Sequence, residues 1–162
     1  MGDVQFRAAK VGDARAILTV KQEAITAIES DEYSERQLAA WCPEDELVED
    51  FGRAIETNRF EILLATMGPS VVAYGVLNTE RNRIDAIFVH PEYWGKGIGS
   101  SLVRQFEARA RIKALPELKI VSSLNASGFY EEMGYFDFGR KQRTINGVEL
   151  EFAIMRKVFE TE

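Results

Sequence analysis

Three glycines stand at every second position in the stretch EYWGKGIGSSL, residues 92–102. Gly95, Gly97 and Gly99 are followed at once by apolar helix formers, so the stretch predicts a turn that opens a helix. The first N–H groups of a helix lack intrahelical acceptors, and its dipole stabilises a nearby anion by roughly 0.3–1 kcal/mol. Without β-carbons in the way, a phosphate can reach these amides, so the stretch indicates an anion site. The alternative is a tight turn that only packs helix against sheet.

Two familiar phosphate-binding loops do not fit this stretch. A Walker loop carries Lys and then Ser or Thr after its second glycine, whereas Lys96 precedes Gly97 here. A dinucleotide fingerprint needs Gly or Ala where Ser100 stands, and it usually follows the first strand of its fold. Several predicted strands already precede this loop. The sequence therefore disfavours a nucleotide-dependent oxidoreductase.

The same stretch resembles the acyl-CoA-binding signature of the GNAT acetyltransferase superfamily, written Gln/Arg-x-x-Gly-x-Gly/Ala. Gly97 and Gly99 take its two small positions. Trp94 stands where Gln or Arg is usual, which is a departure that removes one polar contact and leaves the amides in place. The opening FRAAKVGDARAI and the closing alternating strands also resemble the family.

A second block, NASGFYEEMGY, resembles a later motif of the same family. Phe129-Tyr130 and Gly134-Tyr135 are in register, and Gly128 takes the small position. Either block alone is a weak signal. Both blocks, in this order and at about this separation, indicate membership over nearly the whole chain.

The resemblance implies acetyl-CoA as acyl donor, with CoA as product, held mainly by backbone amides. It assigns the thioester carbonyl to the amides of Phe88, Val89 and His90. It implies a contact from Asn125 to the pantetheine arm, although Asn125 can instead cap the helix that follows. No metal is expected. The resemblance assigns the pyrophosphate to the amides of Gly95, Lys96, Gly97, Ile98, Gly99 and Ser100.

Transfer from a thioester releases a thiolate, and Tyr130 is the candidate acid that protonates it. In a helix over 126–133, Phe129 and Met133 are expected on the buried face, with the Tyr130 side chain about 100° away and facing the cofactor. A phenol of pKa about 10 protonates a thiolate of pKa about 8.5 uphill by roughly 2 kcal/mol, so the site must assist or the transfer must accompany C–S cleavage. The alternative is a tyrosine anchored by an ordinary hydrogen bond.

The general base is left open by the sequence. An alkyl amine of pKa about 10.4 is almost wholly protonated at pH 7, so deprotonation of the acceptor matters. His90 and Asp85 would lie on opposite faces of a strand over 83–90 if side chains alternate, so only one of them faces the acceptor. Glu23, Glu80 and a chain of water molecules are further options.

The elements that would position these residues alternate between strands and helices. Apolar runs and period-two patterns predict strands at 4–9, 61–66, 71–78, 83–90, 117–123, 135–139 and 148–157. Helical spacing and capping signals predict helices after Asp13, at 35–41 behind the pair Ser34 and Gln37, over 44–58, after the glycines and at 126–133.

These elements predict an α/β fold, a single GNAT-like domain over residues 1–162. Its sheet would be mixed and mostly antiparallel, with six to seven strands flanked by helices. In the resembled family, the segment that contains Tyr33, Leu38 and Trp41 shapes the acceptor pocket.

Composition bounds the class of protein. The chain has 162 residues, of which 46% are hydrophobic and 28% charged, which is typical of a globular domain. No apolar stretch has the length of a membrane span and the first residues carry no secretion signal, so no membrane partner is expected. Cys42 is the one cysteine, which favours a cytoplasmic location and packing rather than nucleophilic catalysis. A net charge of −6 argues against a nucleic-acid partner and would suit a cationic substrate.

We therefore predict a GNAT-type N-acetyltransferase that moves an acetyl group from acetyl-CoA to a primary amine by direct attack in a ternary complex. The amine would belong to a small molecule, a peptide or a protein, and a homodimer is one possible assembly. The alternative is a non-catalytic acyl-CoA-binding regulatory domain, which the unusual Trp94 leaves open.

Overall fold

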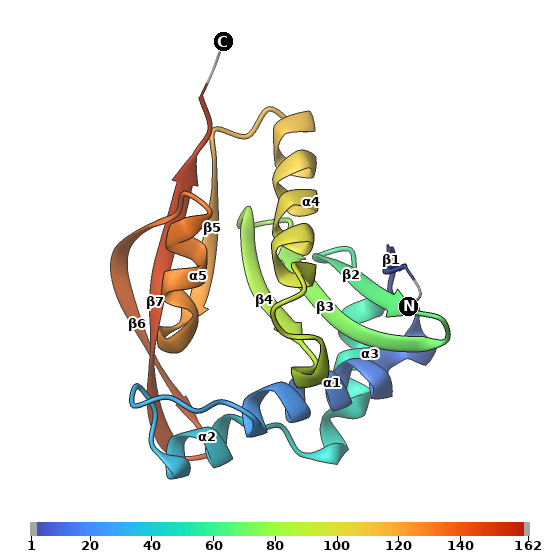
Figure 1. Ribbon diagram of the computed structural model, residues 1–162, viewed down its shortest axis with the longest axis vertical. Coiled ribbons are helices and arrows are strands. Elements are labelled where there is room, and N and C mark those ends of the chain that lie inside the picture. The colour runs from blue at the N-terminus through green and yellow to red at the C-terminus, as the bar shows by residue number, and fades with distance from the viewer. Residues whose placement is uncertain (1–2, 161–162) are drawn as a thin grey trace.

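Residues 3–160 are described by the computed structural model, in which helices cover both faces of a seven-stranded sheet (Figure 1). The strands lie in the order β1-β2-β3-β4-β5-β7-β6. Within this part of the chain β4 and β5 pair in parallel, and every other neighbouring pair is antiparallel. The predicted α/β class is confirmed. The strands are β1 (Gln5–Ala8), β2 (Phe60–Met67), β3 (Ser70–Asn78), β4 (Arg83–Val89), β5 (Glu117–Ser123), β6 (Phe136–Ile145) and β7 (Val148–Val158).

Helices form the two outer layers because their apolar faces pack on opposite sides of the strands. Ile17 of α1 packs against Leu64 and Tyr74 on one face. On the other face, a Cβ added to Gly75 would lie 2.7 Å from Cε2 of Phe106, so this glycine lets α4 approach the sheet closely. The helices are α1 (Ala14–Thr26), α2 (Glu35–Trp41), α3 (Val48–Glu56), α4 (Ile98–Ile112) and α5 (Ser127–Glu132).

The parallel strands β4 and β5 diverge soon after they begin. Their pairing is confined to Arg83 with Lys119 and Ile84 with Ile120. Figure 1 shows the two strands splaying apart towards the end of β4. The remaining length of β4 therefore has a partner on the β3 side and an open edge on the other.

A β-bulge interrupts β4 where the sequence suggested regular alternation. The register jumps from Val76–Ala86 to Leu77–Ile84, which leaves Asp85 unpaired. As a result Ile84 joins the core under α4, whereas Ala86 and Phe88 pack with the core under α1. The expectation that Asp85 and His90 must lie on opposite faces is therefore wrong, because it assumed an uninterrupted strand.

Local signals in the sequence located most element boundaries. Ser34 and Gln37 form the predicted capping box of α2, with Gln37 N donating to Ser34 Oγ over 3.1 Å and Ser34 N to Gln37 Oε1 over 2.9 Å. Asp13 precedes α1 as predicted, but its carboxylate accepts from Lys10 N and pairs with Arg7 rather than capping α1. Strand β6 runs to Ile145, beyond the predicted end at residue 139. In residues 3–160 no helix is both long and apolar enough to cross a bilayer.

Candidate active site

A cavity of about 530 Å³ opens where β4 and β5 splay apart. One wall is the β4 edge and the loop that follows it, and another is the β5–α5 connection. The third comes from α1 and α2. The lining residues are Ala24, Ile28, Trp41, Ile87, Phe88, Val89, Tyr93, Trp94, Gly95, Gly97, Ile98, Gly99, Ser100, Ser123, Asn125, Ala126, Phe129 and Tyr130.

Helix α4 opens onto this cavity without a side-chain cap. Its N-cap is Gly97, and the first intrahelical bond is Ser101 N to Gly97 O at 3.1 Å. The N–H groups of Ile98, Gly99 and Ser100 have no acceptor among residues 3–160. Helix α2 differs, because the side chain of its N-cap residue Ser34 accepts a hydrogen bond from a backbone N–H of the first turn. The start of α4 is thus free to bind an anion from outside.

Backbone conformation accounts for two of the three glycines. Gly95 and Gly97 have φ of 78° and 80°, in the left-handed region that side chains disfavour. A Cβ at either position would have no atom within 4 Å, so nothing in the protein itself crowds them. Gly99 has no positive φ, and its Cβ would lie 3.4 Å from Cζ of Phe129. The loop therefore needs glycine to aim its amides, whether or not a ligand comes close.

Of the three β4 amides assigned to the thioester, the structure directs one at the cavity. His90 N donates to Val72 O over 2.8 Å, so that amide is already bonded to β3. Because bonded and non-bonded pairs alternate in an antiparallel ladder, Phe88 also points its N–H at β3, and Val89 points its N–H away. The expectation for Phe88 and His90 is therefore wrong, and the Val89 N–H is the one of the three that does not bond to β3.

Trp94, where the family signature has Gln or Arg, bonds to this same edge. Its indole Nε1 donates to Val89 O over 2.6 Å, while the side chain stays 47% exposed. The Trp94 ring thus lines the cavity, and its hydrogen bond engages the Val89 carbonyl group beside the free Val89 N–H. A peptide-like chain that paired with the β4 edge would compete with the indole for this carbonyl.

Tyr130 reaches the cavity from α5. Its side chain is buried, yet its hydroxyl has no hydrogen-bond partner among the described residues. Burial raises the pKa of this phenol above its usual range, so the hydroxyl keeps its proton throughout the physiological range. The sequence was wrong about its neighbour: Phe129 is 37% exposed rather than buried, and its ring meets the Tyr130 ring edge-on at 5.0 Å.

Asn125 does not cap the helix that follows it. The N-cap position of α5 is Ala126, and Ser123 precedes the short 3₁₀ turn at Leu124–Ala126. The capping interpretation of Asn125 is therefore wrong. Its exposed amide is on the cavity wall and is free of bonds to the described part of the chain.

No candidate base lies on the cavity wall. Asp85 pairs with Arg83 and accepts from Asn78 Nδ2 over 3.3 Å. Glu80 pairs with Arg59 at 3.7 Å, and Glu23 is exposed on α1. His90 Nδ1 accepts from Glu92 N over 3.2 Å. Of the options that the sequence left open, a water molecule is the one that needs no rearrangement.

In the segment predicted to shape the acceptor pocket, one aromatic residue lines the cavity and another holds the segment in place. Trp41 lines the cavity. Tyr33 is buried, donates to Glu151 O over 2.6 Å and accepts from Leu124 N over 3.0 Å, so it ties the segment before α2 to β7 and to the turn after β5. Ala24 and Ile28 also line the cavity, but at helical spacing they resemble ordinary core residues, so no sequence signal distinguished them.

Known proteins share both the sequence pattern and this fold. The family described as acetyltransferase (GNAT) domain matches residues 29–158. A protein described as the uncharacterized N-acetyltransferase YafP, of Escherichia coli strain K12, is 27% identical over 135 residues, 83% of each chain. A GCN5-related N-acetyltransferase from Rhodopseudomonas palustris is 27% identical with a TM-score of 0.88, covering 98% of both chains.

More distant structures share the fold. PaiA N-acetyltransferase from Thermoplasma acidophilum, solved with coenzyme A, is 21% identical with a TM-score of 0.73, and the match covers 97% of this chain and 99% of that one. The family match, by contrast, spans most of the sequence, from before α2 into the last strand. The chain therefore belongs to the GNAT acetyltransferase family, and it is an acyltransferase enzyme whose acyl donor is acetyl-CoA.

Proposed function

We propose that this enzyme transfers an acetyl group from acetyl-CoA to a primary amine by direct attack within a ternary complex. The observation that carries the proposal is the uncapped start of α4 on the same cavity as the free Val89 N–H and the unbonded Tyr130 hydroxyl. When bound, acetyl-CoA supplies an acetyl group that is already activated as a thioester.

The α4 start and the β4 edge fit different parts of such a donor. The amides of Ile98, Gly99 and Ser100, with those of the preceding loop, would hold the pyrophosphate at the positive end of the α4 dipole. The ammonium of Lys96, in the same loop, adds a positive charge there. The open β4 edge would hold the extended pantetheine arm, with Asn125 opposite.

Val89 and Tyr130 would act on the reacting atoms. The Val89 N–H would donate to the acetyl oxygen, where negative charge develops as the amine attacks. The Tyr130 hydroxyl would give its proton to the departing sulfur. Since burial raises the phenol pKa, a free thiolate would be too weak a base to take that proton in a separate step. The transfer must accompany cleavage of the C–S bond.

The acceptor amine would lose its proton to water rather than to a side chain. Asp85, Glu80 and His90 are all engaged elsewhere, and Glu23 faces solvent. A site of this kind favours amines that enter neutral, so the rate of transfer should rise with pH towards the pKa of the acceptor.

A non-catalytic acyl-CoA-binding role is favoured by one observation, the bond from Trp94 Nε1 to Val89 O at the reacting end of the cavity. Both the transferase and the non-catalytic role predict binding of acetyl-CoA, and only the transferase role predicts turnover.

Two measurements test the proposal. Calorimetric titration should detect acetyl-CoA and CoA but not NAD, which would bind if the glycine loop served a dinucleotide. A panel of primary amines, scored by release of the CoA thiol, should then contain acceptors. Tight acetyl-CoA binding without thiol release from any amine would favour the regulatory role.

Three earlier expectations stay predictions: a single domain over 1–162, a cytoplasmic location and a homodimer.

A further inference from the structure

Cations converge on the side of the cavity where the acceptor would enter, although the chain as a whole carries a net charge of −6. Lys21 of α1 lies one turn before Ala24, on the helix face that lines the cavity. Its Nζ lies 5.5 Å from the centroid of the Phe88 ring and 5.8 Å from that of Phe51. No hydrogen bond or ion pair to Lys21 is found within residues 3–160.

Strand β6 brings two more cations to the same face. Lys141 is opposite Phe152 and Arg143 is opposite Leu150 in the β6–β7 pair, and both of these β7 residues pack on the α2 side of the sheet. The Arg143 guanidinium carbon lies 5.8 Å from the Phe152 ring centroid. Neither cation has an ion-pair partner in the described part of the chain.

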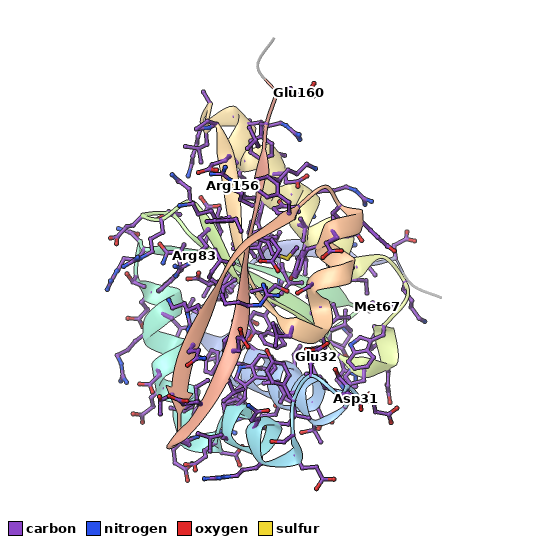
Figure 2. All side chains as sticks on the ribbon, turned by 90° about the vertical axis from the view of Figure 1, so that its left-hand side faces the viewer. Asp31, Glu32, Met67, Arg83, Arg156 and Glu160 are labelled. Carbon is purple, nitrogen blue, oxygen red and sulfur yellow. The ribbon has the colours of Figure 1, made fainter. Side chains whose placement is uncertain are left out.

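The start of β4 completes this cationic cluster, defined as Lys21, Arg81, Arg83, Lys141 and Arg143. Figure 2, with the β6–β7 hairpin in front, shows Arg83 beside that hairpin. The positive charges of Arg143, Arg83 and Arg81 lower the pKa of Lys141. Burial, with Arg143 nearby, lowers the pKa of Lys21 to about 8. The negative charge of Asp85 also acts on Lys141, but Arg83 already engages that carboxylate.

Aromatic rings connect the cluster to the cavity. The Phe88 ring lies 5.8 Å from that of Trp41, which lies 5.6 Å from that of Phe152. Lys21 contacts the first ring of this row and Arg143 the last. Phe88 and Trp41 also line the cavity, and Val89 follows Phe88 directly. A small molecule lying on these rings would therefore have its amine near Val89 and its other end among the cations.

We propose that the acceptor is a small primary amine that also carries an anionic group, a carboxylate or a phosphate, which Lys21 and Arg143 bind from the two ends of the aromatic row. The inference rests on the proposed acetyl transfer and names its substrate class. It reverses the expectation of a cationic substrate, because net charge averages over a surface whereas these cations are gathered at one site. A polyamine would meet repulsion here.

Lys21, which is partly buried, and Arg143, which is exposed, would each gain a partner on binding. A hydrogen bond to a charged group contributes about 1.5–3 kcal/mol, which corresponds to roughly 10- to 100-fold in affinity. We therefore expect the anion to act mainly through KM of the acceptor.

The test compares matched acceptors on the full chain with saturating acetyl-CoA. γ-Aminobutyrate, aminopropylphosphonate, γ-aminobutyramide and butylamine share a primary amine and differ at the other end. We expect kcat/KM about 10-fold or more higher for one or both anionic amines than for the neutral pair. Whichever anionic amine leads identifies the carboxylate or the phosphate. A preference for butylamine or the amide would overturn the proposal.

Variants link the preference to the cluster. Lys21→Met keeps the length of the side chain without its charge, and Arg143→Gln keeps a polar group. Each should bring the anionic and neutral amines within about threefold, since the charge-assisted bond is lost. Arg36→Met, which removes an exposed α2 cation outside the cluster, should leave the preference unchanged. Unchanged discrimination in Lys21→Met and Arg143→Gln would place the anion elsewhere and overturn the proposal.

A thermal-shift measurement separates this inference from the transfer proposal. If acetyl-CoA binds and no amine is acetylated, the transfer proposal fails. The anionic amines should still raise Tm of the parent and not of Lys21→Met if the anion subsite exists. An equal Tm shift in both proteins, or none in either, would overturn the anion subsite by itself.

Discussion

The two sides of the cavity are built from different material. The donor side, consisting of the α4 start, its glycine loop and the β4 edge, presents mainly backbone N–H groups. The acceptor side presents the rings of Trp41, Phe88 and Phe152 together with cations from α1 and β6. The first recognises groups that every acetyl-CoA molecule carries, whereas the second can change with single substitutions.

This difference teaches where specificity resides. Backbone amides are the same in every protein, so a site made from them needs only the correct chain path, which Gly95 and Gly97 provide through their positive φ. A site made from side chains depends on residues such as Lys21 and Arg143, which the fold itself does not require. The following predictions test whether the two sides are separable.

The largest effect is expected from Tyr130→Phe, which deletes only the hydroxyl at the junction of the two sides. Packing and acetyl-CoA affinity should survive, because the ring and its edge-on contact with Phe129 remain. Turnover should fall by roughly 10²–10⁴, the usual contribution of a positioned proton donor. Steady-state kinetics with the best acceptor would measure this.

A thioester with a more acidic leaving thiol is the control for this variant. That thiolate needs less protonation, so the loss caused by Tyr130→Phe should shrink. If Tyr130 only positioned the donor, both thioesters would slow equally. Activity within about twofold of the parent on acetyl-CoA would remove Tyr130 from the chemistry.

Lys21→Met should stabilise the folded acceptor side at neutral pH. The native pKa of about 8 lies below the unfolded value of about 10.4, so burial of the charged lysine costs roughly 3 kcal/mol below pH 8. Between these two pKa values the unfolded chain binds more protons, so stability of the parent rises with pH. The advantage of Lys21→Met should therefore be largest below pH 8 and vanish near pH 10.5.

Urea unfolding of parent and variant across this pH range measures the gap. Arg36→Met is the matched control, because its cation is exposed on α2 and should change little at any pH. A Lys21→Met protein that is less stable than the parent at pH 7 would show that Lys21 is paired in solution.

Gly97→Ala should damage the donor side and spare the acceptor side. At φ of 80° a side chain costs about 1–2 kcal/mol, so the loop will shift and the α4 amides will lose their aim. Acetyl-CoA affinity should fall by about 10-fold or more, with the ratio of kcat/KM between anionic and neutral amines unchanged. Gly99→Ala is the matched control, since Gly99 has no positive φ and its new methyl would contact side-chain carbons of Phe129, Val89 and Ile87 at 3.4–3.8 Å. Equal acetyl-CoA affinity in the parent and a folded Gly97→Ala protein would sink the loop assignment.

The two sides also differed in how far the sequence revealed them. Glycine spacing and the strand before it located the donor side, because backbone conformations that need glycine leave a mark on the sequence. The register of β4 could not be read in the same way. The bulge at Asp85 follows from pairing with β3, a contact between strands that no local pattern encodes, and it moved Asp85 to another face.

The acceptor side was found only in part. Trp41 fell within a recognised segment, but Lys21 looks like any polar residue of an amphipathic helix. Lys21 stands out only because the tertiary fold brings the positive charge of Arg143, more than a hundred residues later in the sequence, close enough to act on it. Phe129 was wrongly expected to be buried, because α5 has only six residues, too few for helical periodicity to set which side faces the core.

The smallest effect is expected from Trp94, and it tests whether side chains matter on the donor side at all. Trp94→Phe removes the indole N–H bond to Val89 O and keeps an aromatic ring at the mouth of the cavity. The freed carbonyl can then accept from an amide of the donor, which offsets the lost bond of about 0.5–1.5 kcal/mol. Acetyl-CoA affinity should therefore stay level or improve by up to about threefold, and Trp94→Arg, which restores a residue usual in the family signature, should bind at least as well. Calorimetry on both variants measures this. A 10-fold weakening in both folded proteins would mean that the indole itself binds the donor, and that the donor side, like the acceptor side, depends on a side chain that the family does not share.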